Sequence, residues 1–225
     1  MTTPEIQKAL ARELWAMQSR LLDAESVRVV LDVGAWRGHR ATWYAKAFPA
    51  ATVYAMEPEP NAYALLVARA EMEPRIVPVQ AAAGVTDGTA RFYVNDTPDT
   101  ASLLPVSVGF AATGRIHAAG AIDVPTVRLD GFCARHGIER VDVLKLDVQG
   151  AELQALDGAR GLFERGAVGL VMAELNFWRY YDGQCWWYEV GAWLARYGYE
   201  LVAIAPEWWE GRVKFCDGLF ARGLS

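Results

Sequence analysis

Three acidic residues follow or end apolar segments of the chain, in positions that suit the binding of a nucleoside. They are Asp32 in VVLDVGAWRG (29–38), Glu57 in TVYAMEPEP (52–60) and Asp147 in LKLDVQGAE (144–152). In open α/β sheets, ligands bind at the carboxyl ends of the parallel strands, and an acid at one strand end accepts hydrogen bonds from ribose hydroxyls. We therefore expect the three carboxylates at one sheet edge, with Glu57 placed to hold a ribose.

The turn after Asp32 distinguishes between nucleoside cofactors. Gly34 and Gly38 allow backbone amides to approach a ligand closely. Trp36, however, occupies the middle position of the G-x-G-x-x-G pattern, where a glycine lets a pyrophosphate lie against the helix N-terminus. A Trp at this position and the nearby carboxylate of Asp32 disfavour a pyrophosphate and tolerate a cationic ligand. S-adenosylmethionine fits this pattern, because it carries an adenosine, a sulfonium and an amino group but no phosphate.

The segment LKLDVQGAE predicts a group at the reacting centre. Side chains alternate along a strand, so Lys145 and Asp147 share one face. Gly150 then allows the chain to turn close to a ligand. A second interpretation is that Asp147 caps the helix that follows, since a carboxylate can accept hydrogen bonds from the first amides of a helix.

The spacing of apolar residues predicts the elements that hold these groups. Strands are expected over 28–33, 52–56, 75–82, 141–148, 168–175, 199–205 and 212–221, an extended run over 123–128, and helices over 38–47, 61–71, 129–136, 151–164 and 186–197. Strand and helix alternating at this spacing specify right-handed crossovers and a parallel sheet. The predicted fold class is α/β, with a doubly wound, mostly parallel seven-stranded sheet of the Rossmann-like type.

Three further segments elaborate the predicted sheet. Apolar residues at helical spacing over 4–24 predict an N-terminal helix that caps the domain edge. A turn over 84–88 and an alternating strand over 90–94 predict an inserted hairpin. The segment 95–120 is rich in Thr, Ser, Pro, Gly and Ala, and a loop of this length is usually functional or mobile.

Composition bounds the class of protein. The chain has 225 residues, of which 53% are hydrophobic, so it can bury a large core. A formal charge of -5 provides no global basic field, and we expect no nucleic acid partner. No run approaches the roughly 18 apolar residues that a membrane span needs, so a cytoplasmic location is expected. The three cysteines are scattered and predict neither disulfides nor a zinc cluster.

Taken in order, the motifs resemble the FkbM-type methyltransferases. The segments that carry the resemblance are LDVGAWRG, Glu57-Pro58, AAAGVTDGTARFYV (81–94), VPTVRLDGF (124–132) and LKLDVQGAE. The resemblance covers about residues 28–205. It implies the class I S-adenosylmethionine-dependent methyltransferase fold and methylation of hydroxyl oxygens on sugars or secondary metabolites. One domain is then expected over 1–225, with a helical cap over 1–27 and a catalytic core over 28–225.

Site residues follow from the resemblance by position. Asp32, Gly34 and Gly38 would line the methionine end, Glu57 would hold the ribose, and Asp147 would lie beside the methyl-transfer site. The full cofactor set is Asp32, Gly34, Ala35, Trp36, Gly38, Glu57, Pro58, Ala82 and Asp147. Two residues depart from the family pattern, because the family commonly has Glu where Gln149 stands and Asn where Trp36 stands.

Methyl transfer requires placement of the acceptor first and a base second, since the sulfonium is already activated. Asp147 is the leading candidate for the base or for a group that orients the acceptor oxygen. His39, just after the cofactor turn, and His117, in the predicted loop, are further catalytic candidates. His136 precedes Gly137 and is expected at a helix end, where an imidazolium favourably meets the helix dipole.

The end of the strand over 168–175 and the loop after it predict an acceptor pocket. Glu174 and Asn176 are two residues apart and face the same way, and Trp178 and Tyr181 supply aromatic surfaces for an acceptor ring. A metal-assisted alternative uses the oxygens of Asp147, Glu174 and Asn176 to bind Mg²⁺, which would lower the pKa of the acceptor hydroxyl. Leu175 interrupts the adjacent acid and amide pair of the metal-dependent catechol methyltransferases that this arrangement resembles.

The sequence leaves several functions open. The first is an O-methyltransferase acting on a small-molecule or glycan acceptor. The alternatives are an N-methyltransferase acting on a small-molecule or peptide amine, and a nonenzymatic nucleoside-binding module. A dehydrogenase is disfavoured by Trp36 in the glycine turn. Oligomeric state stays open, and the N-terminal helix with exposed aromatic residues is compatible with a homodimer.

Overall fold

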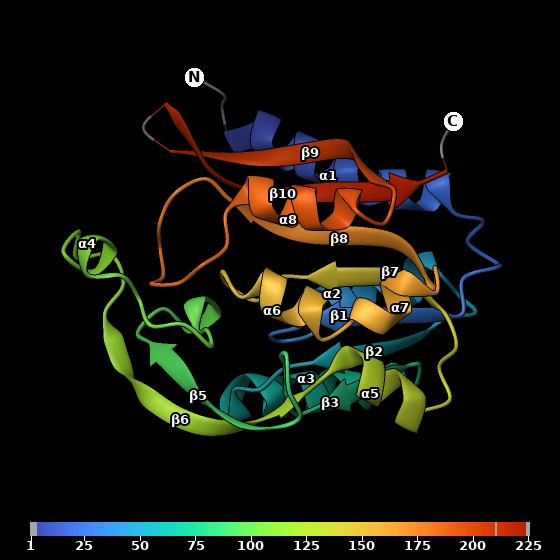
Figure 1. The fold of residues 1–225 in the computed structure, drawn as a ribbon, viewed down its shortest axis with the longest axis horizontal. Helices are drawn as coiled ribbons and strands as arrows, with labels where there is room; N and C mark the ends of the chain where they lie inside the picture. Colours follow the sequence, from blue (N-terminus) through green and yellow to red (C-terminus); the bar gives the residue numbers. More distant parts are fainter. Residues whose placement is uncertain (1–3, 210, 224–225) are drawn as a thin grey trace.

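A seven-stranded sheet forms the centre of the molecule (Figure 1), which we describe from a computed structural model covering residues 4–209 and 211–223. Its strands are β1 (Val29–Val33), β2 (Thr52–Met56), β3 (Ile76–Val79), β7 (Val141–Leu146), β8 (Val168–Asn176), β9 (Tyr199–Trp209) and β10 (Arg212–Arg222). They lie in the order β3-β2-β1-β7-β8-β10-β9, and β10 runs antiparallel to both of its neighbours. The predicted doubly wound, mostly parallel sheet is confirmed.

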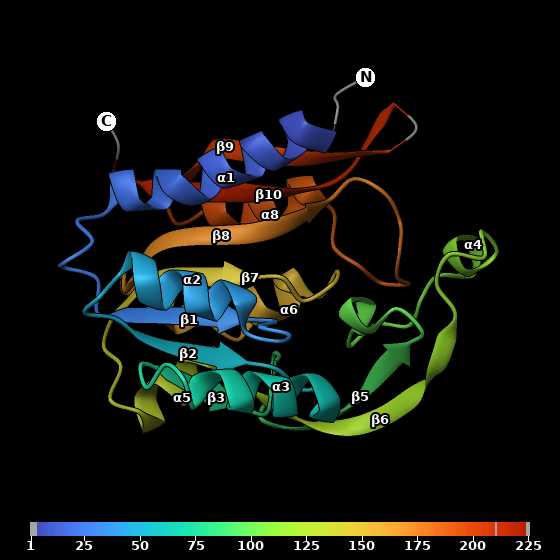
Figure 2. The same cartoon turned by 180° about the vertical axis from the view of Figure 1, so that it is seen from behind.

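Helices cover both faces of the sheet. One face carries α1 (Pro4–Leu21), α2 (His39–Ala47) and α3 (Pro60–Ala70), which Figure 2 shows in front. The other carries α5 (Leu129–Arg135), α6 (Glu152–Asp157), α7 (Arg160–Glu164) and α8 (Trp187–Ala195). Successive residues of one strand enter opposite cores, as Val143 and Leu144 do in β7, because side chains alternate across a sheet. These strands therefore read as continuous apolar runs buried on both sides.

The N-terminal helix α1 packs on β9 and β10 (Figure 2). Its buried face includes Leu14 and Trp15, and the Gln18 amide accepts a hydrogen bond from the Tyr44 hydroxyl inside the core. The helix that was predicted to reach residue 24 ends at Leu21. Residues 1–3 of the predicted cap, together with residues 210, 224 and 225, lie outside the described residues.

The inserted region is a second sheet of β4 (Ala82–Ala83), β5 (Gly88–Asn95) and β6 (Ala118–Val127). The insertion was predicted, but the prediction of a hairpin across the 84–88 turn was wrong, because the strands before and after this turn do not pair with each other. β6 lies between the other two strands and pairs antiparallel with β5 and parallel with β4. The long connection from β5 to β6 contains a 3-10 helix, η1 (Pro98–Thr100), and a short helix, α4 (Val108–Ala111), where only a loop was expected.

The helix predicted over 151–164 is divided into α6 and α7. A Cβ atom at Gly158 would lie 2.2 Å from the main-chain oxygen of Gly84, so the second sheet approaches the helix layer at this break. The apolar spacing is continuous through the break and gives no sign of it. Within residues 4–209 and 211–223, no helix has the length and apolar character needed to cross a bilayer.

Candidate active site

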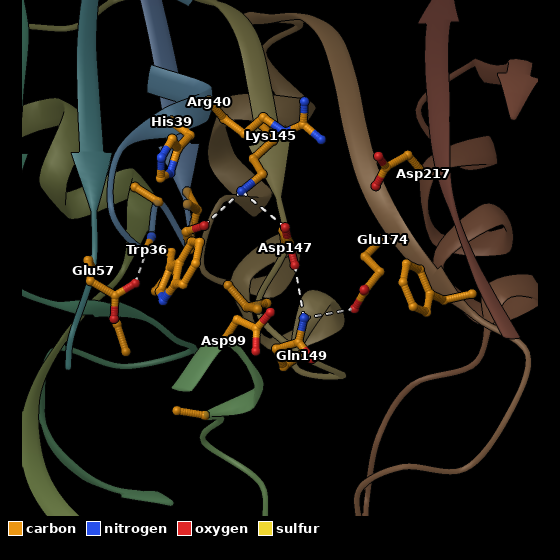
Figure 3. Close-up of a pocket in the computed structure, with 18 of the residues that line it drawn as sticks. Trp36, His39, Arg40, Glu57, Asp99, Lys145, Asp147, Gln149, Glu174 and Asp217 are labelled. Atoms are coloured by element: carbon orange, nitrogen blue, oxygen red, sulfur yellow. Dashed lines mark hydrogen bonds and ion pairs between the residues drawn. The ribbon is translucent and has the colours of Figure 1, made fainter. Parts of the chain in front are cut away.

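The carboxyl ends of β1, β2, β7 and β8 border a cavity of about 500 Å³, which we call the first cavity (Figure 3). Most of the predicted cofactor residues line it: Gly34, Ala35, Trp36, Glu57, Pro58, Ala82 and Asp147. His39 and Glu174 line it as well. Asp32 and Gly38 do not. Asp32 is fully buried below the cavity, and Gly38 precedes α2 and packs against α3.

Gly34 joins the first strand of the site to the strand that carries Asp147. Its φ is +78°, and a Cβ atom here would lie only 1.8 Å from the Asp147 main-chain oxygen. The amide of Asp147 in turn donates a hydrogen bond to the Val33 oxygen at 3.1 Å. Glycine is therefore required at position 34 for contact between the strand ends, in addition to the ligand approach that the sequence predicted.

Glu57 is held in place by two backbone donors. Its Oε2 accepts a hydrogen bond from the Trp36 amide at 2.8 Å, and its Oε1 accepts one from the Glu59 amide at 2.8 Å. Trp36 reaches this contact with a φ of 48°, a left-handed conformation that is uncommon for a bulky residue. Burial raises the pKa of Glu57 to about 7, although both amides favour the charged form. Each oxygen keeps a lone pair for another donor, such as a ribose hydroxyl.

Lys145 links Asp32 to Asp147. Its Nζ lies 3.1 Å from Asp32 Oδ1 and 3.4 Å from Asp147 Oδ2, and it donates a hydrogen bond to the Gly34 oxygen at 2.7 Å. Burial alone would lower the pKa of Lys145, but the two carboxylates outweigh it and raise the pKa above its usual value. Burial also raises the pKa of Asp32, and Lys145 opposes that rise. Asp32 does not line the cavity itself, but it holds the ammonium group of Lys145, which does.

Gln149 joins Asp147 to Glu174 across the site (Figure 3). Its Nε2 donates to Asp147 Oδ1 at 3.1 Å and to Glu174 Oε2 at 3.4 Å. The Tyr181 hydroxyl donates to the Gln149 Oε1 at 3.0 Å, and the Ser102 hydroxyl donates to its main-chain oxygen. Gln149 has a φ of 56°, a left-handed conformation that is uncommon for a residue other than glycine. The hydrogen bonds of its side chain and its main-chain oxygen hold it in this conformation. Burial, with the nearby Asp147 carboxylate, raises the pKa of Glu174 well above its usual value.

The geometry gives no support to the predicted magnesium site. The Gln149 amide donates a hydrogen bond to each of the two carboxylates that were expected to share the ion, and a cation cannot occupy the place of those N–H groups. Among the described residues, no three His, Cys, Asp or Glu side chains are grouped so as to hold a metal ion. Glu174 and Asn176 are both buried at the end of β8 without forming such a group.

The two candidate catalytic histidines lie in different places. His39 lines the first cavity, 5.8 Å from the Trp36 ring, and its Nε2 lies 3.2 Å from Arg69 Nη2. Burial and the neighbouring guanidinium groups, first that of Arg69, lower the pKa of His39. Because a guanidinium only donates, the contact with Arg69 occupies the Nε2 lone pair that a general base would use. His117 is exposed and lines neither of the cavities described here, and its amide donates to Asp96 Oδ1. The structure therefore does not bring His117 to the site described here, and its catalytic role stays a prediction.

A second cavity of about 470 Å³ adjoins the first. Four residues line both cavities: Asp99, Gln149, Glu174 and Phe215. Of the predicted acceptor-binding residues, Asn176 and Tyr181 line the second cavity, whereas Trp178 packs against the aromatic cluster around Phe110 and Tyr180 that forms its wall. The connection from β5 to β6 closes this wall, because the Ser107 amide donates to the Tyr180 oxygen at 2.8 Å.

Sequence reasoning assigned no role to several residues that complete the site. Lys145 had a signal, because it lies two residues before Asp147 on the same strand face. Gln149 had one in its difference from the family pattern. Asp217 and Lys214 had none, because they come from β10, far along the chain, and only the antiparallel pairing of β10 with β8 brings them to the site.

Comparisons with known proteins show the family of the chain. The Methyltransferase FkbM domain family matches residues 32–201. The 2-O-methyltransferase NoeI of Sinorhizobium fredii is 28% identical over 195 residues, which cover 82% of this chain and 77% of that protein.

Two solved structures share the fold. A methyltransferase FkbM from Methylobacillus flagellatus is 17% identical, with a TM-score of 0.53. The match covers 87% of this chain but only 43% of that larger chain. The magnesium protoporphyrin IX methyltransferase of Synechocystis, solved with bound S-adenosylmethionine (SAM), is 11% identical, with a TM-score of 0.55 and coverage of 96% of this chain and 79% of that one.

The family match begins at Asp32, near the end of β1, and spans the glycine turn, the strand before Glu57 and the segment around Asp147. It confirms the resemblance that the motifs indicated, and this chain belongs to the FkbM family of methyltransferases.

Proposed function

We propose that the protein is a SAM-dependent O-methyltransferase that acts on a hydroxyl group of a sugar or secondary metabolite. One observation carries the proposal: Asp147 lies in the first cavity, hydrogen bonded to Gln149, which lines both cavities. A cofactor in the first cavity and an acceptor in the second would therefore meet at a carboxylate that can receive a proton. The name of the relative in Sinorhizobium fredii, a 2-O-methyltransferase, supports a hydroxyl acceptor.

The residues of the first cavity suit SAM. The buried Glu57 carboxylate has free lone pairs for the ribose hydroxyls, and Trp36 leaves no glycine cradle for a pyrophosphate. On the other side of Lys145 (Figure 3), Arg40 and Asp217 offer opposite charges for the carboxylate and ammonium of the methionine end. When bound, SAM supplies a methyl group that the sulfonium has already activated. Asp32 would act indirectly, by fixing the Lys145 ammonium.

Asp147 has two roles in this proposal. Its carboxylate orients the acceptor hydroxyl toward the first cavity and receives the hydroxyl proton as the new bond to oxygen forms. Lys145 on one side and Gln149 on the other keep the carboxylate in a single orientation. This preorganisation matters because well-oriented reactions recover roughly 7 to 11 kcal/mol of barrier, whereas a general base contributes on the order of 100- to 10,000-fold in rate.

The test is methyl transfer from isotope-labelled SAM to a panel of hydroxylated sugars and phenols, with matched amines, and mass spectrometry to locate the methyl group. We expect methylation on oxygen and S-adenosylhomocysteine binding that NAD does not reproduce. Methylation only of the amines would replace the proposal with N-methyl transfer. Binding of S-adenosylhomocysteine without transfer to any acceptor would favour a nonenzymatic nucleoside-binding role.

A further inference from the structure

The second cavity contains buried polar groups that the fold leaves without partners. Asn176 is 3% exposed and Tyr180 is 6% exposed. Neither the Asn176 Nδ2 nor the Tyr180 hydroxyl forms a hydrogen bond with any described residue, although the Asn176 amide lies close enough to Glu174 to favour its charged form. A buried polar group without a partner costs roughly 1 to 3 kcal/mol. Such groups at a cavity wall are available to form hydrogen bonds with a ligand.

Lys214 adds a positive charge to the same wall. It is half-buried on β10, and its Nζ lies 5.6 Å from the Tyr180 ring centre and 5.2 Å from the Phe215 ring centre. Within the described part of the chain, no carboxylate lies at ion-pair distance from Lys214. Rings attract a cation only through their faces and leave its N–H groups able to donate to an anion. Lys145, by contrast, is paired with two carboxylates.

The other charges of this cavity leave room for an anion. Burial and the adjacent Asp147 carboxylate favour the neutral form of Glu174. A neutral carboxyl group can donate a hydrogen bond to a negative group, whereas a carboxylate would repel it. Asp99 is exposed at the border with the first cavity, and Arg115, which is also exposed, adds a second positive charge to the lining. The groups that face the interior are therefore mostly donors.

We propose that the methyl acceptor is a hydroxylated anion, held in the second cavity with its oxyanion group on Lys214 and the Asn176 amide and with its hydroxyl toward Asp147. The aromatic walls from Phe110, Tyr180 and Phe215 would contact the ring of the acceptor. A carboxylate, phosphate or sulfate shares the chemistry that these donors recognise. This inference rests on the proposed function, because it defines the acceptor of the same site.

The experiment compares anionic compounds with neutral partners of the same ring. The pairs are D-glucuronate with D-glucose and 4-hydroxybenzoate with 4-hydroxybenzamide, and D-glucose 6-phosphate separates phosphate from carboxylate. Methyl transfer is measured as kcat/KM, and binding to the protein loaded with S-adenosylhomocysteine is measured by saturation-transfer NMR. We expect at least one anion to exceed its neutral partner by roughly tenfold or more, since hydrogen bonds to charged groups are the strong ones.

Variants assign that preference to Lys214. Lys214→Gln should reduce the ratio between anion and neutral partner to within about twofold, and Lys214→Arg should retain most of it, because the positive charge is kept. Lys46→Gln, which removes an exposed lysine of α2, is the control and should leave the ratio unchanged. Affinity for S-adenosylhomocysteine should stay the same in all three variants.

Two results would overturn the inference: wild-type protein that shows no preference for an anion in any pair, or a preference that persists in Lys214→Gln. Its failure is distinguishable from failure of the proposed function. If neutral sugars are methylated as well as the acids, only the anionic acceptor is wrong. If S-adenosylhomocysteine does not bind and nothing is methylated, the proposed function is wrong, and NMR binding of the pairs to the protein alone still decides whether the cavity prefers anions.

Discussion

The two cavities that meet at Gln149 differ in how their polar groups are satisfied. In the first, Glu57 accepts hydrogen bonds from two backbone amides and Lys145 pairs with two carboxylates, although the buried Trp36 Nε1 has no partner among the described residues. In the second, Asn176 Nδ2 and the Tyr180 hydroxyl have no partner among the described residues. The difference indicates that the charged groups of the cofactor side are fixed before any ligand arrives, whereas the polar groups of the acceptor side are completed by its ligand. Cofactor recognition and acceptor choice are thus separable within one continuous site.

The largest expected effect is the loss of stability when the contact between Gly34 and the Asp147 main chain, at the first cavity, is disrupted. Gly34→Ala would place a Cβ atom 1.8 Å from the Asp147 oxygen, so the strand ends must separate. We expect a loss of about 5 kcal/mol or more in the free energy of unfolding, which is a large share of the roughly 5 to 15 kcal/mol by which folded domains are stable.

Gly114→Ala, in the connection beside the second cavity, is the control for backbone strain alone. Its φ is +70°, yet a Cβ atom would meet nothing within 4 Å. Its expected cost is about 1 kcal/mol. Urea unfolding measures both variants, and equal losses would contradict the packing role of Gly34.

Lysines of the two cavities should differ in their contribution to stability. Lys145→Met leaves the fully buried Asp32 carboxylate without its cation, and breaking such a pair costs about 3 to 5 kcal/mol. Lys214→Met should cost less than about 1 kcal/mol, because it removes no ion pair. Adding Asp32→Asn to Lys145→Met should recover part of the loss in urea unfolding. If the double variant is no more stable than Lys145→Met, the two side chains are not coupled.

Substitution of Asp147, at the junction of the two cavities, should lower the rate of methyl transfer far more than the affinity for the cofactor product. Asp147→Ala removes the group that would take the acceptor proton, and we expect methyl transfer to fall by about 100-fold or more. Affinity for S-adenosylhomocysteine should change by less than about tenfold, because Glu57 still holds the ribose. Single-turnover kinetics and calorimetry measure the two quantities. Turnover that is unchanged in the variant would exclude the role of Asp147.

The smallest expected effect is a pH dependence confined to the first cavity. The ionised form of Glu57 accepts the ribose hydroxyls, and its pKa is raised to about 7. Because protonation competes with ribose binding below that pH, affinity for S-adenosylhomocysteine should fall by about tenfold from pH 8 to pH 6. Calorimetry across this range should show the dependence in wild-type protein and not in Glu57→Gln. A dependence that survives the substitution belongs to another group.

The first cavity could largely be predicted from the sequence. Residues of the first cavity follow strand ends, so a glycine turn after β1 and an acid after β2 indicate both the fold and the cofactor side. Asp147 was found in the same way. The exception is Asp32, whose partner Lys145 lies on another strand, so its burial below the cavity depends on the β1 and β7 pairing.

The second cavity could not be predicted in this way, because connecting segments build most of it. The weak periodicity of 95–120 hides α4 and the start of β6, whose first residues are two alanines and a glycine with little strand preference. Lys214 comes from a strand that reaches the site only by antiparallel pairing with β8. Local sequence patterns contain no information about such contacts, because the acceptor wall forms only through tertiary structure.

One calorimetric experiment tests the division between the cavities most directly. S-adenosylhomocysteine is titrated into wild-type protein, into Glu57→Ala from the first cavity and into Tyr180→Phe from the second. We expect Glu57→Ala to lose at least about tenfold in affinity, because the ribose loses a charged acceptor, and Tyr180→Phe to stay within about twofold of wild type. Equal losses in the two variants, or full affinity in Glu57→Ala, would contradict the assignment of the cofactor to the first cavity.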